Sequence, residues 1–145
     1  VRVKLDKILE QMISQYEKLK IGQLAWQKPE IKVPTIEVRL QAMRRALDNL
    51  ISNALRYASF AEIRLEVRDD NLYIFIDDNG PGIPLNQRAD ALRPFVRLEG
   101  SRNKETGGTG LGLAIAHDII LSHGGELTLR DSPLGGLRVT ILLPV

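Results

Sequence analysis

The sequence of 145 residues has no cysteine, no long apolar run and no marked excess of one charge. Without cysteine, disulfides, zinc–thiolate sites and thiol catalysis are all excluded. No hydrophobic stretch approaches the roughly 18 residues that a membrane-spanning helix needs, and no signal peptide is visible. Twenty lysines and arginines face eighteen acidic residues, which leaves a net charge of +2. This balance gives no reason to expect nucleic-acid or membrane binding.

What the sequence does contain is typical of a folded domain. Hydrophobic residues make up 43% of the chain and charged residues 26%, so a globular structure of about one domain is expected over residues 1–145. The chain begins with Val1 instead of methionine. We therefore expect it to be a piece of a longer protein.

Hydrophobic periodicity predicts three helices and about six strands. The helices are expected at 6–20, with Asp6 as its N-cap, at 41–57 and at 111–123. The strands are expected at 23–27, 36–40, 61–68, 72–77, 126–131 and 137–143. This pattern favours an α+β fold with helices on one face of a mixed, mostly antiparallel sheet of five to six strands. The long segment 79–110 is rich in glycine, proline and charge, and its central part at about 86–108 is predicted to be a mobile functional lid.

The second helix carries a polar stripe beside its apolar one. Asn49, Asn53 and Arg56 fall within roughly 60° of arc at 100° per residue. Asparagine is a poor helix former, yet its side-chain oxygen is a suitable neutral ligand for Mg²⁺. Taken by itself, the stripe fits a solvated helix face as well as a metal site.

Two glycine-containing segments follow. Asp78 continues the inward-facing row of the strand before it, and Gly80 and Gly82 would let a planar base approach the backbone. By itself this segment also fits an ordinary turn. The run 107–113 opens the third helix with closely spaced glycines, which suits either an anion site or a flexible hinge. It matches neither a Walker A loop nor a dinucleotide fingerprint.

The order of these elements is more specific than any one of them. The order of motifs resembles that of the ATP-binding domain of sensor histidine kinases. It consists of an asparagine-bearing helix, a strand ending in Asp-x-Gly-x-Gly, a long lid, and Gly-x-Gly-x-Gly at the start of a helix. These kinases share a superfamily with gyrase, MutL and heat-shock chaperone ATPases. Segments 56–57, 94–97 and 135–138 resemble EnvZ-type kinases in particular. The resemblance implies a Bergerat-type fold, a two-layer α/β sandwich.

The resemblance also implies roles for individual residues. Asn53 would ligate the Mg²⁺ of Mg-ATP, and Asn49 would support the metal or the phosphates during catalysis. Arg97 would meet the γ-phosphate, as the second residue with a catalytic role. Asp78 would accept the adenine amino group. The remaining nucleotide contacts would come from Arg56, Tyr57, Gly80, Gly82, Ile83, Phe95, Gly108, Thr109, Gly110, Leu111 and Gly112. The family's aromatic residue three positions before Phe95 is Leu92 here, which puts the lid's closed geometry in doubt.

One position separates the classes of the superfamily. Its ATPases carry a glutamate as general base one turn before the metal asparagine, whereas this chain has Asn49, which cannot take a proton. The resemblance therefore implies transfer of the γ-phosphate to a histidine instead of hydrolysis. The acceptor histidine would lie on a separate helical dimerisation domain, outside this chain. From there the phosphoryl group would pass to a response regulator.

The whole protein would then be a membrane-anchored homodimer that binds no nucleic acid. This chain would be its cytoplasmic domain, at a bacterial inner membrane. The alternatives are a stand-alone ATPase, an anti-sigma-type serine kinase, or an interaction module that has lost its chemistry.

Overall fold

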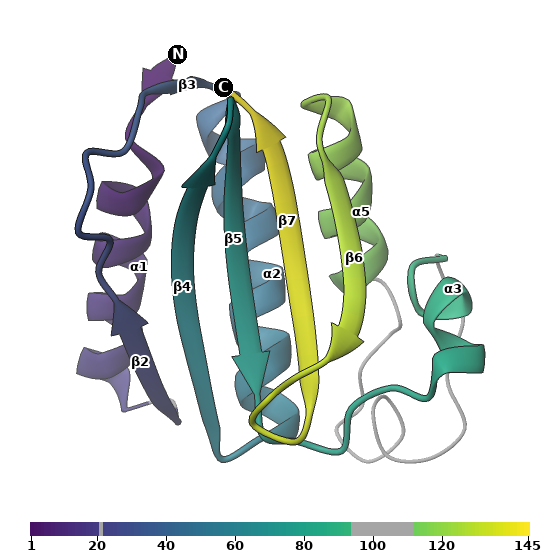
Figure 1. Ribbon diagram of the computed structural model, residues 1–145. Coiled ribbons are helices and arrows are strands. Elements are labelled where there is room, and N and C mark those ends of the chain that lie inside the picture. Colours follow the sequence, from purple (N-terminus) through teal and green to yellow (C-terminus); the bar gives the residue numbers. More distant parts are fainter. Residues whose placement is uncertain (21, 94–111) are drawn as a thin grey trace.

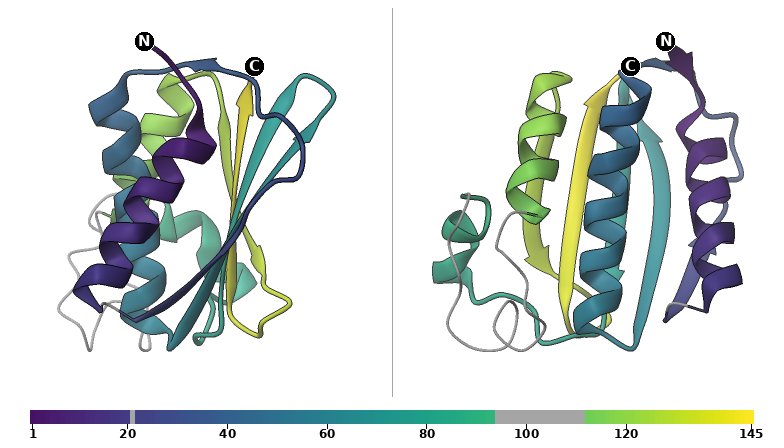
Figure 2. Two further views of the ribbon diagram at one scale, coloured as in Figure 1. Left: turned by 90° about the vertical axis from the view of Figure 1, so that its left-hand side faces the viewer. Right: turned by 180° about the vertical axis from the view of Figure 1, so that it is seen from behind.

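Three long helices cover one face of a five-stranded sheet and leave the other face open, as Figure 2 shows from the side and from behind. The computed structural model describes residues 1–20, 22–93 and 112–145. Within them the helices are α1 (Leu5–Leu19), α2 (Leu40–Tyr57), α3 (Arg88–Ala91) and α5 (Gly112–Ser122), with a 3₁₀ turn η1 (Leu85–Gln87). The strands are β1 (Arg2–Val3), β2 (Gln23–Gln27), β3 (Ile36–Glu37), β4 (Phe60–Arg68), β5 (Asn71–Asp78), β6 (Glu126–Asp131) and β7 (Leu137–Pro144).

The main sheet is mixed, as predicted. Its strand order is β2-β4-β5-β7-β6, with β2 parallel to β4 and every other neighbour antiparallel (Figure 1). The predicted hairpin is formed by β4 and β5, which pair from Ala61 with Asp78 to Arg68 with Asn71. The α+β class and the helix-covered sheet are confirmed.

The core lies between the helices and the covered face of the sheet. The apolar stripe of α2 is buried there, with Met43, Leu47 and Ile51 fully inaccessible to solvent. From the sheet, Ile63 and Ile74 are equally buried. Because α2 is flanked by α1 and α5 on this face (Figure 2), its polar residues emerge only along the remaining strip of its surface.

β5 lies at the centre of the sheet and is buried on both faces over its second half. Ile74 and Ile76 point into the core, while Phe75 and Asp77 are buried on the open face at 7% and 3% exposure. Asp78 ends the strand at 1% exposure. Two consecutive buried carboxylates are costly unless each has hydrogen-bond partners.

Two predictions about local structure were wrong, and one segment contains helical structure that the sequence analysis did not assign. Asp6 does not cap α1, because the helix begins one residue earlier and Lys4 occupies the N-cap position without a side-chain bond. The strand expected at 36–40 ends at Glu37, since α2 begins at Leu40, and it pairs with β1 outside the main sheet. The first residues of the expected lid form η1 and α3.

Candidate functional site

The carboxyl end of α2 and the end of β5 meet at one end of the sandwich, at the bottom of Figure 1. Gly80 packs directly on the last turn of α2: a Cβ at this position would lie 2.8 Å from the carbonyl oxygen of Tyr57. A larger residue would therefore push the two segments apart. Asn79 reinforces the junction, because its Oδ1 accepts the backbone N–H groups of Ser59 and Phe60 at 3.1 and 3.0 Å.

The Asp78 side chain lies at this junction, and the backbone holds it in place. Its Oδ1 accepts the N–H of Gly80 at 2.9 Å and the N–H of Leu137, on β7, at 3.1 Å. The Asp78 carbonyl oxygen accepts the N–H of Gly136 at 3.1 Å. The inward direction that strand parity predicted for Asp78 is confirmed. These N–H groups provide hydrogen-bond partners for the buried carboxylate within the protein itself.

The turn before β7 approaches Asp78 so closely that only glycine fits. A Cβ on Gly136 would lie 2.2 Å from Asp78 Oδ1 and 2.6 Å from its carbonyl oxygen. Gly82, which has a φ of +70°, faces the same turn: a Cβ at this position would lie 3.5 Å from the backbone of Gly136. Ile83 follows and is buried at 3% exposure. The carboxylate thus lies between two stretches of glycine-bearing backbone, one with Gly80 and the other with Gly136.

The two asparagines of α2 lie partly buried on its remaining strip. Among the described residues, neither the Asn49 nor the Asn53 side chain has a hydrogen-bond partner, although a partly buried amide gains free energy from one. No group of three or more histidines, aspartates or glutamates that could hold a metal occurs in the described part of the chain. An amide oxygen that shares a cation with phosphates and water suits Mg²⁺, which usually keeps few protein ligands. The residues therefore fit the metal that the sequence predicted.

The other described candidates surround this region. Arg56 and Tyr57 lie in the last turn of α2, with Arg56 exposed and Tyr57 half-buried. Gly112 begins α5, which packs along α2. Within residues 1–20, 22–93 and 112–145, no atom lies within 4 Å of the Cβ that an alanine would add at Gly112. The structure therefore brings Asn49, Asn53, Asp78, Gly80 and Gly82 to elements that contact one another, with α5 beginning alongside.

Residues 39–145 match the family described as histidine kinase-, DNA gyrase B- and HSP90-like ATPases. The chain belongs to this family. The family description supports ATP as the nucleotide, and the matched residues include every candidate named above.

Sensor kinases are prominent among the relatives of this ATPase domain. The chain is 46% identical over 105 residues to the sensor histidine kinase CpxA of Escherichia coli, which is 72% of this chain and 23% of CpxA. It is 40% identical over 126 residues to the sensor protein kinase CarS of Pseudomonas aeruginosa, 85% of this chain and 26% of CarS. The chain thus spans about a quarter of the length of these relatives. The predicted sensor histidine kinase resemblance is confirmed.

Solved kinase domains share the fold of this ATPase domain. The ATP binding domain of PrrB from Mycobacterium tuberculosis has a TM-score of 0.80 at 26% identity, over 99% of this chain and 96% of the other. The histidine kinase domain of the E. coli osmosensor EnvZ has a TM-score of 0.71 at 30% identity, over 99% and 88% of the two chains. The sandwich predicted from the resemblance is confirmed.

Part of the predicted site lies outside the described residues of this ATPase domain: Phe95, Arg97, Gly108, Thr109, Gly110 and Leu111, with most of the expected lid. Their roles stay predictions. The described start of the lid is tied to the sheet, because Arg88 donates to the carbonyl oxygen of Ile83 at 2.9 Å and forms an ion pair with Asp131. Leu92, which replaces the family's aromatic residue, packs against the core.

Sequence reasoning missed the contribution of β7 to the site. Gly136 and Leu137 orient Asp78 from 58 and 59 positions away in the chain. Segment 135–138 resembles EnvZ-type kinases, but the sequence predicts no contact between Gly136 and Asp78. Two adjacent glycines in a strand turn did signal a close approach of backbone, but nothing in the sequence says which segment approaches.

Proposed function

We propose that this chain is the catalytic domain of a sensor histidine kinase. It binds Mg-ATP and transfers the γ-phosphoryl group to a histidine on a separate helical dimerisation domain. That group then passes to an aspartate of a response regulator. The observation that carries the proposal is the buried Asp78 carboxylate, which backbone N–H groups hold at the edge of the asparagine-bearing helix.

Adenine recognition is assigned to Asp78. An ionised carboxylate is purely an acceptor, so it pairs with an exocyclic amine and rejects a carbonyl at the same place. Its orientation needs no rearrangement on binding, because Gly80 and Leu137 already hold Oδ1. Gly80 allows the last turn of α2 to approach Asp78 closely, since a Cβ there would lie 2.8 Å from the Tyr57 carbonyl oxygen. This arrangement favours adenine over guanine.

The phosphates are assigned to α2. Asn53 would hold Mg²⁺ through its amide oxygen, Asn49 would contact the metal or the phosphates one turn earlier, and Arg56 and Tyr57 would extend the contact toward the phosphates and ribose. Mg²⁺, when bound, supplies positive charge that offsets the charge of the phosphates. Arg97, from the lid, is the proposed additional charge at the γ-phosphate.

The transfer needs a nucleophile but no general base on this chain. A neutral imidazole nitrogen of the acceptor histidine already has a free lone pair. It forms a bond to the γ-phosphorus, while the bond from that phosphorus to the β–γ bridging oxygen breaks and ADP leaves with the electron pair. Asn49 cannot accept a proton from water, so hydrolysis is not promoted and positioning accounts for the rate.

In the whole protein, this domain is proposed to be cytoplasmic, in a membrane-anchored bacterial homodimer. Among the described residues, no helix is both long and apolar enough to span a bilayer. The anchor and the acceptor helices would belong to other parts of the protein. The relatives CpxA and CarS have room for such parts, since this chain matches only about a quarter of their length.

The test mixes the chain with candidate helical dimerisation domains and ATP labelled at the γ-phosphate. Label is expected on one dimerisation domain, to be lost when its acceptor histidine is replaced by alanine or when Asn53→Ala is used. Steady release of labelled phosphate by the chain alone, with no labelled partner, would favour the stand-alone ATPase instead.

A further inference from the structure

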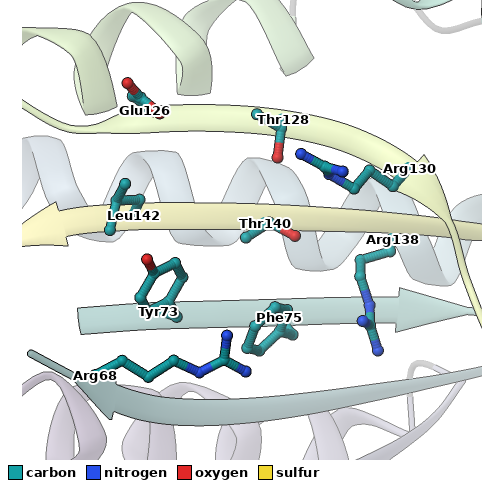
Figure 3. A pocket seen from close by; sticks show the side chains of 9 residues that line it. All are labelled: Arg68, Tyr73, Phe75, Glu126, Thr128, Arg130, Arg138, Thr140 and Leu142. Carbon is teal, nitrogen blue, oxygen red and sulfur yellow. The ribbon is translucent and has the colours of Figure 1, made fainter. Parts of the chain in front are cut away.

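The open face of the sheet has a shallow pocket of about 330 Å³ on the side away from the helices, shown in Figure 3. It lies over β5, β7 and β6 and is separate from the Asp78 junction. Its lining combines arginines, aromatic rings and hydroxyl groups: Arg68, Tyr73, Phe75, Glu126, Thr128, Arg130, Arg138, Thr140 and Leu142. The proposed kinase function uses none of these residues.

Strand register sorts the side chains of this face into three rows. The first row is Glu62, Asp77, Arg138 and Arg130; the second is Arg64, Phe75, Thr140 and Thr128; the third is Glu66, Tyr73, Leu142 and Glu126. Charged groups therefore bound a central row that contains an aromatic ring and two threonines. The pocket lies over the β5, β7 and β6 part of these rows.

The aromatic floor is rigid. The rings of Tyr73 and Phe75 stack with centroids 6.2 Å apart. The guanidinium groups of Arg64 and Arg138 lie 4.5 and 5.0 Å from the Phe75 centroid, which explains how Phe75 is 7% exposed on an open face. Each such contact stabilises the arrangement by roughly 0.5–1 kcal/mol. Because the guanidinium groups cover Phe75, the apolar surface that remains accessible on this preformed floor comes from Tyr73 and the neighbouring Leu142 (Figure 3).

Most charges on this face are already neutralised within the sheet. Arg138 binds Asp77 through two hydrogen bonds of 2.8 and 3.0 Å, and Arg64 and Arg68 both pair with Glu66. In contrast, within the part of the chain that the structure describes, the exposed Arg130 and Glu126 side chains form no ion pair or hydrogen bond. These two residues leave one positive and one negative end to the pocket.

This charge pattern disfavours a polyanion and favours a segment with both charges. The rows and Arg68 together hold four arginines and four acidic residues, so nucleic acid would meet as much repulsion as attraction. Arg130 and Glu126 are four residues apart on β6, which is about 13 Å. An extended peptide places its residues i and i+4 the same distance apart and turns residue i+2 to the same side.

We propose that this face binds an extended peptide segment of a partner protein with the pattern acidic-x-apolar-x-basic. The acidic side chain pairs with Arg130 beside the Thr128 hydroxyl. The apolar side chain lies on the floor made by Tyr73, Phe75 and Leu142. The basic side chain pairs with Glu126. The proposal does not rest on the kinase function, because Arg130 and Glu126 belong to neither the Asp78 junction nor α2.

The experiment titrates the ¹⁵N-labelled chain with the peptide Gly-Ser-Asp-Ser-Leu-Ser-Lys-Ser-Gly. Amide shifts are expected in residues 126–130 and 138–142, with saturation at millimolar peptide. Arg130→Glu is expected to weaken binding at least fivefold. Arg45→Glu is the matched control, because Arg45 is also exposed and without an ion pair in the described structure but lies on α2. It should leave the affinity unchanged.

A charge swap tests the pairing directly. Glu126→Lys should lower the affinity for the original peptide. The same variant should bind more tightly to a peptide in which the lysine is replaced by aspartate. Absence of shifts up to 10 mM, shifts confined to the helical face, or equal binding by Arg130→Glu and the wild type would each overturn the proposal. Calorimetric ATP binding in the same samples should not change with Arg130→Glu. If the wild-type chain bound no ATP, the kinase function would be contradicted, whereas the peptide-binding proposal would stand.

Discussion

Asp77 and Asp78 are neighbours in sequence, equally buried, and stabilised by different means on opposite faces of one strand. Asp77 faces the open side, where the guanidinium of Arg138 binds both of its oxygens. This hydrogen bond raises the pKa of Arg138 above its ordinary value. Asp78 faces the candidate site, where neutral backbone N–H groups hold Oδ1. A salt bridge therefore stabilises Asp77, whereas backbone hydrogen bonds orient Asp78, the proposed adenine-binding residue.

The difference follows from what each position has to do. Arg138 reaches Asp77 directly across the β5–β7 ladder, since the two residues are register partners. In the proposed function, an arginine beside Asp78 would occupy the place of the adenine and neutralise the carboxylate that pairs with its amino group. Backbone donors fix the direction of a carboxylate without adding a side chain. Asp77 is thus suited to stability and Asp78 to binding.

The largest expected effect comes from filling the space beside Asp78. Gly136→Ala would place a Cβ 2.2 Å from Asp78 Oδ1 and 2.6 Å from the backbone nitrogen of Gly80. Because the contacts are mostly with backbone atoms, no rotamer change relieves them. We expect a loss of about 3 kcal/mol in the free energy of unfolding and loss of ATP binding.

Urea denaturation and calorimetry measure the two effects of Gly136→Ala. Gly112→Ala is the control for stability, because no atom of the described residues lies within 4 Å of the added Cβ, and it should change stability by less than about 0.5 kcal/mol. If Gly136→Ala matched that control, the tight approach of β7 to Asp78 would be wrong.

The next largest effect is expected on ATP affinity when Asp78, and not Asp77, is changed. Asp78→Asn keeps an oxygen that can accept the N–H groups of Gly80 and Leu137, but it replaces the other carboxylate oxygen with a donor. We expect ATP affinity to fall at least tenfold, since a hydrogen bond to a charged group contributes about 1.5–3 kcal/mol. Calorimetry with Mg-ATP measures it. Unchanged affinity would exclude Asp78 from adenine recognition.

Asp78 also shows what the sequence could and could not predict. Alternation along residues 72–78 indicated correctly that its side chain turns inward, and the choice between site and turn followed from the order of motifs. The donors on β7 were not predictable, because the pairing of β7 with β5 depends on the folded sheet. The partner of Asp77 was not predictable for the same reason, because Arg138 lies 61 residues away in the sequence.

Local predictions failed where the preferences of nearby residues compete with packing between segments that are distant in the sequence. The strand at 36–40 has good strand composition, but Leu40 already belongs to the apolar stripe of α2, so the helix takes it. Asp6 is a good N-cap type, yet Leu5 is fully buried as the first helical residue, and core packing sets the start of α1. At both boundaries a leucine packs into the core or against it: Leu5 is fully buried and Leu40 is partly buried.

A smaller effect is expected on the open face. Asp77→Asn should lower the free energy of unfolding by about 1–2 kcal/mol, because it leaves the partly buried Arg138 without its charge partner. ATP affinity should stay within twofold of the wild type. A double-mutant cycle with Arg138→Met isolates the pair and should give a coupling of about 1 kcal/mol. Loss of ATP binding in Asp77→Asn would break the division of roles between the two carboxylates.

The smallest effect concerns a third carboxylate, Asp48, which is exposed and accepts a hydrogen bond from the phenol of Tyr16 on α1. Burial raises the pKa of Tyr16 well above its ordinary value, and the bond to Asp48 raises it further. The raised pKa means that the fold favours the neutral phenol. Its contribution to stability is therefore complete below about pH 10, the ordinary tyrosine value, and is lost as the pH rises above it.

Tyr16→Phe tests this contrast between an exposed and a buried acceptor. At neutral pH the variant should lose about 0.5–1 kcal/mol of unfolding free energy, as for a single neutral donor. Between pH 10 and 11.5 the wild type should lose stability more steeply than the variant, so the two curves converge. Parallel curves in urea denaturation across that range would contradict the bond. Since Asp48 precedes Asn49, an accompanying fall in ATP affinity would mean that α1 positions α2, the helix proposed to hold the metal, as well as covering the sheet.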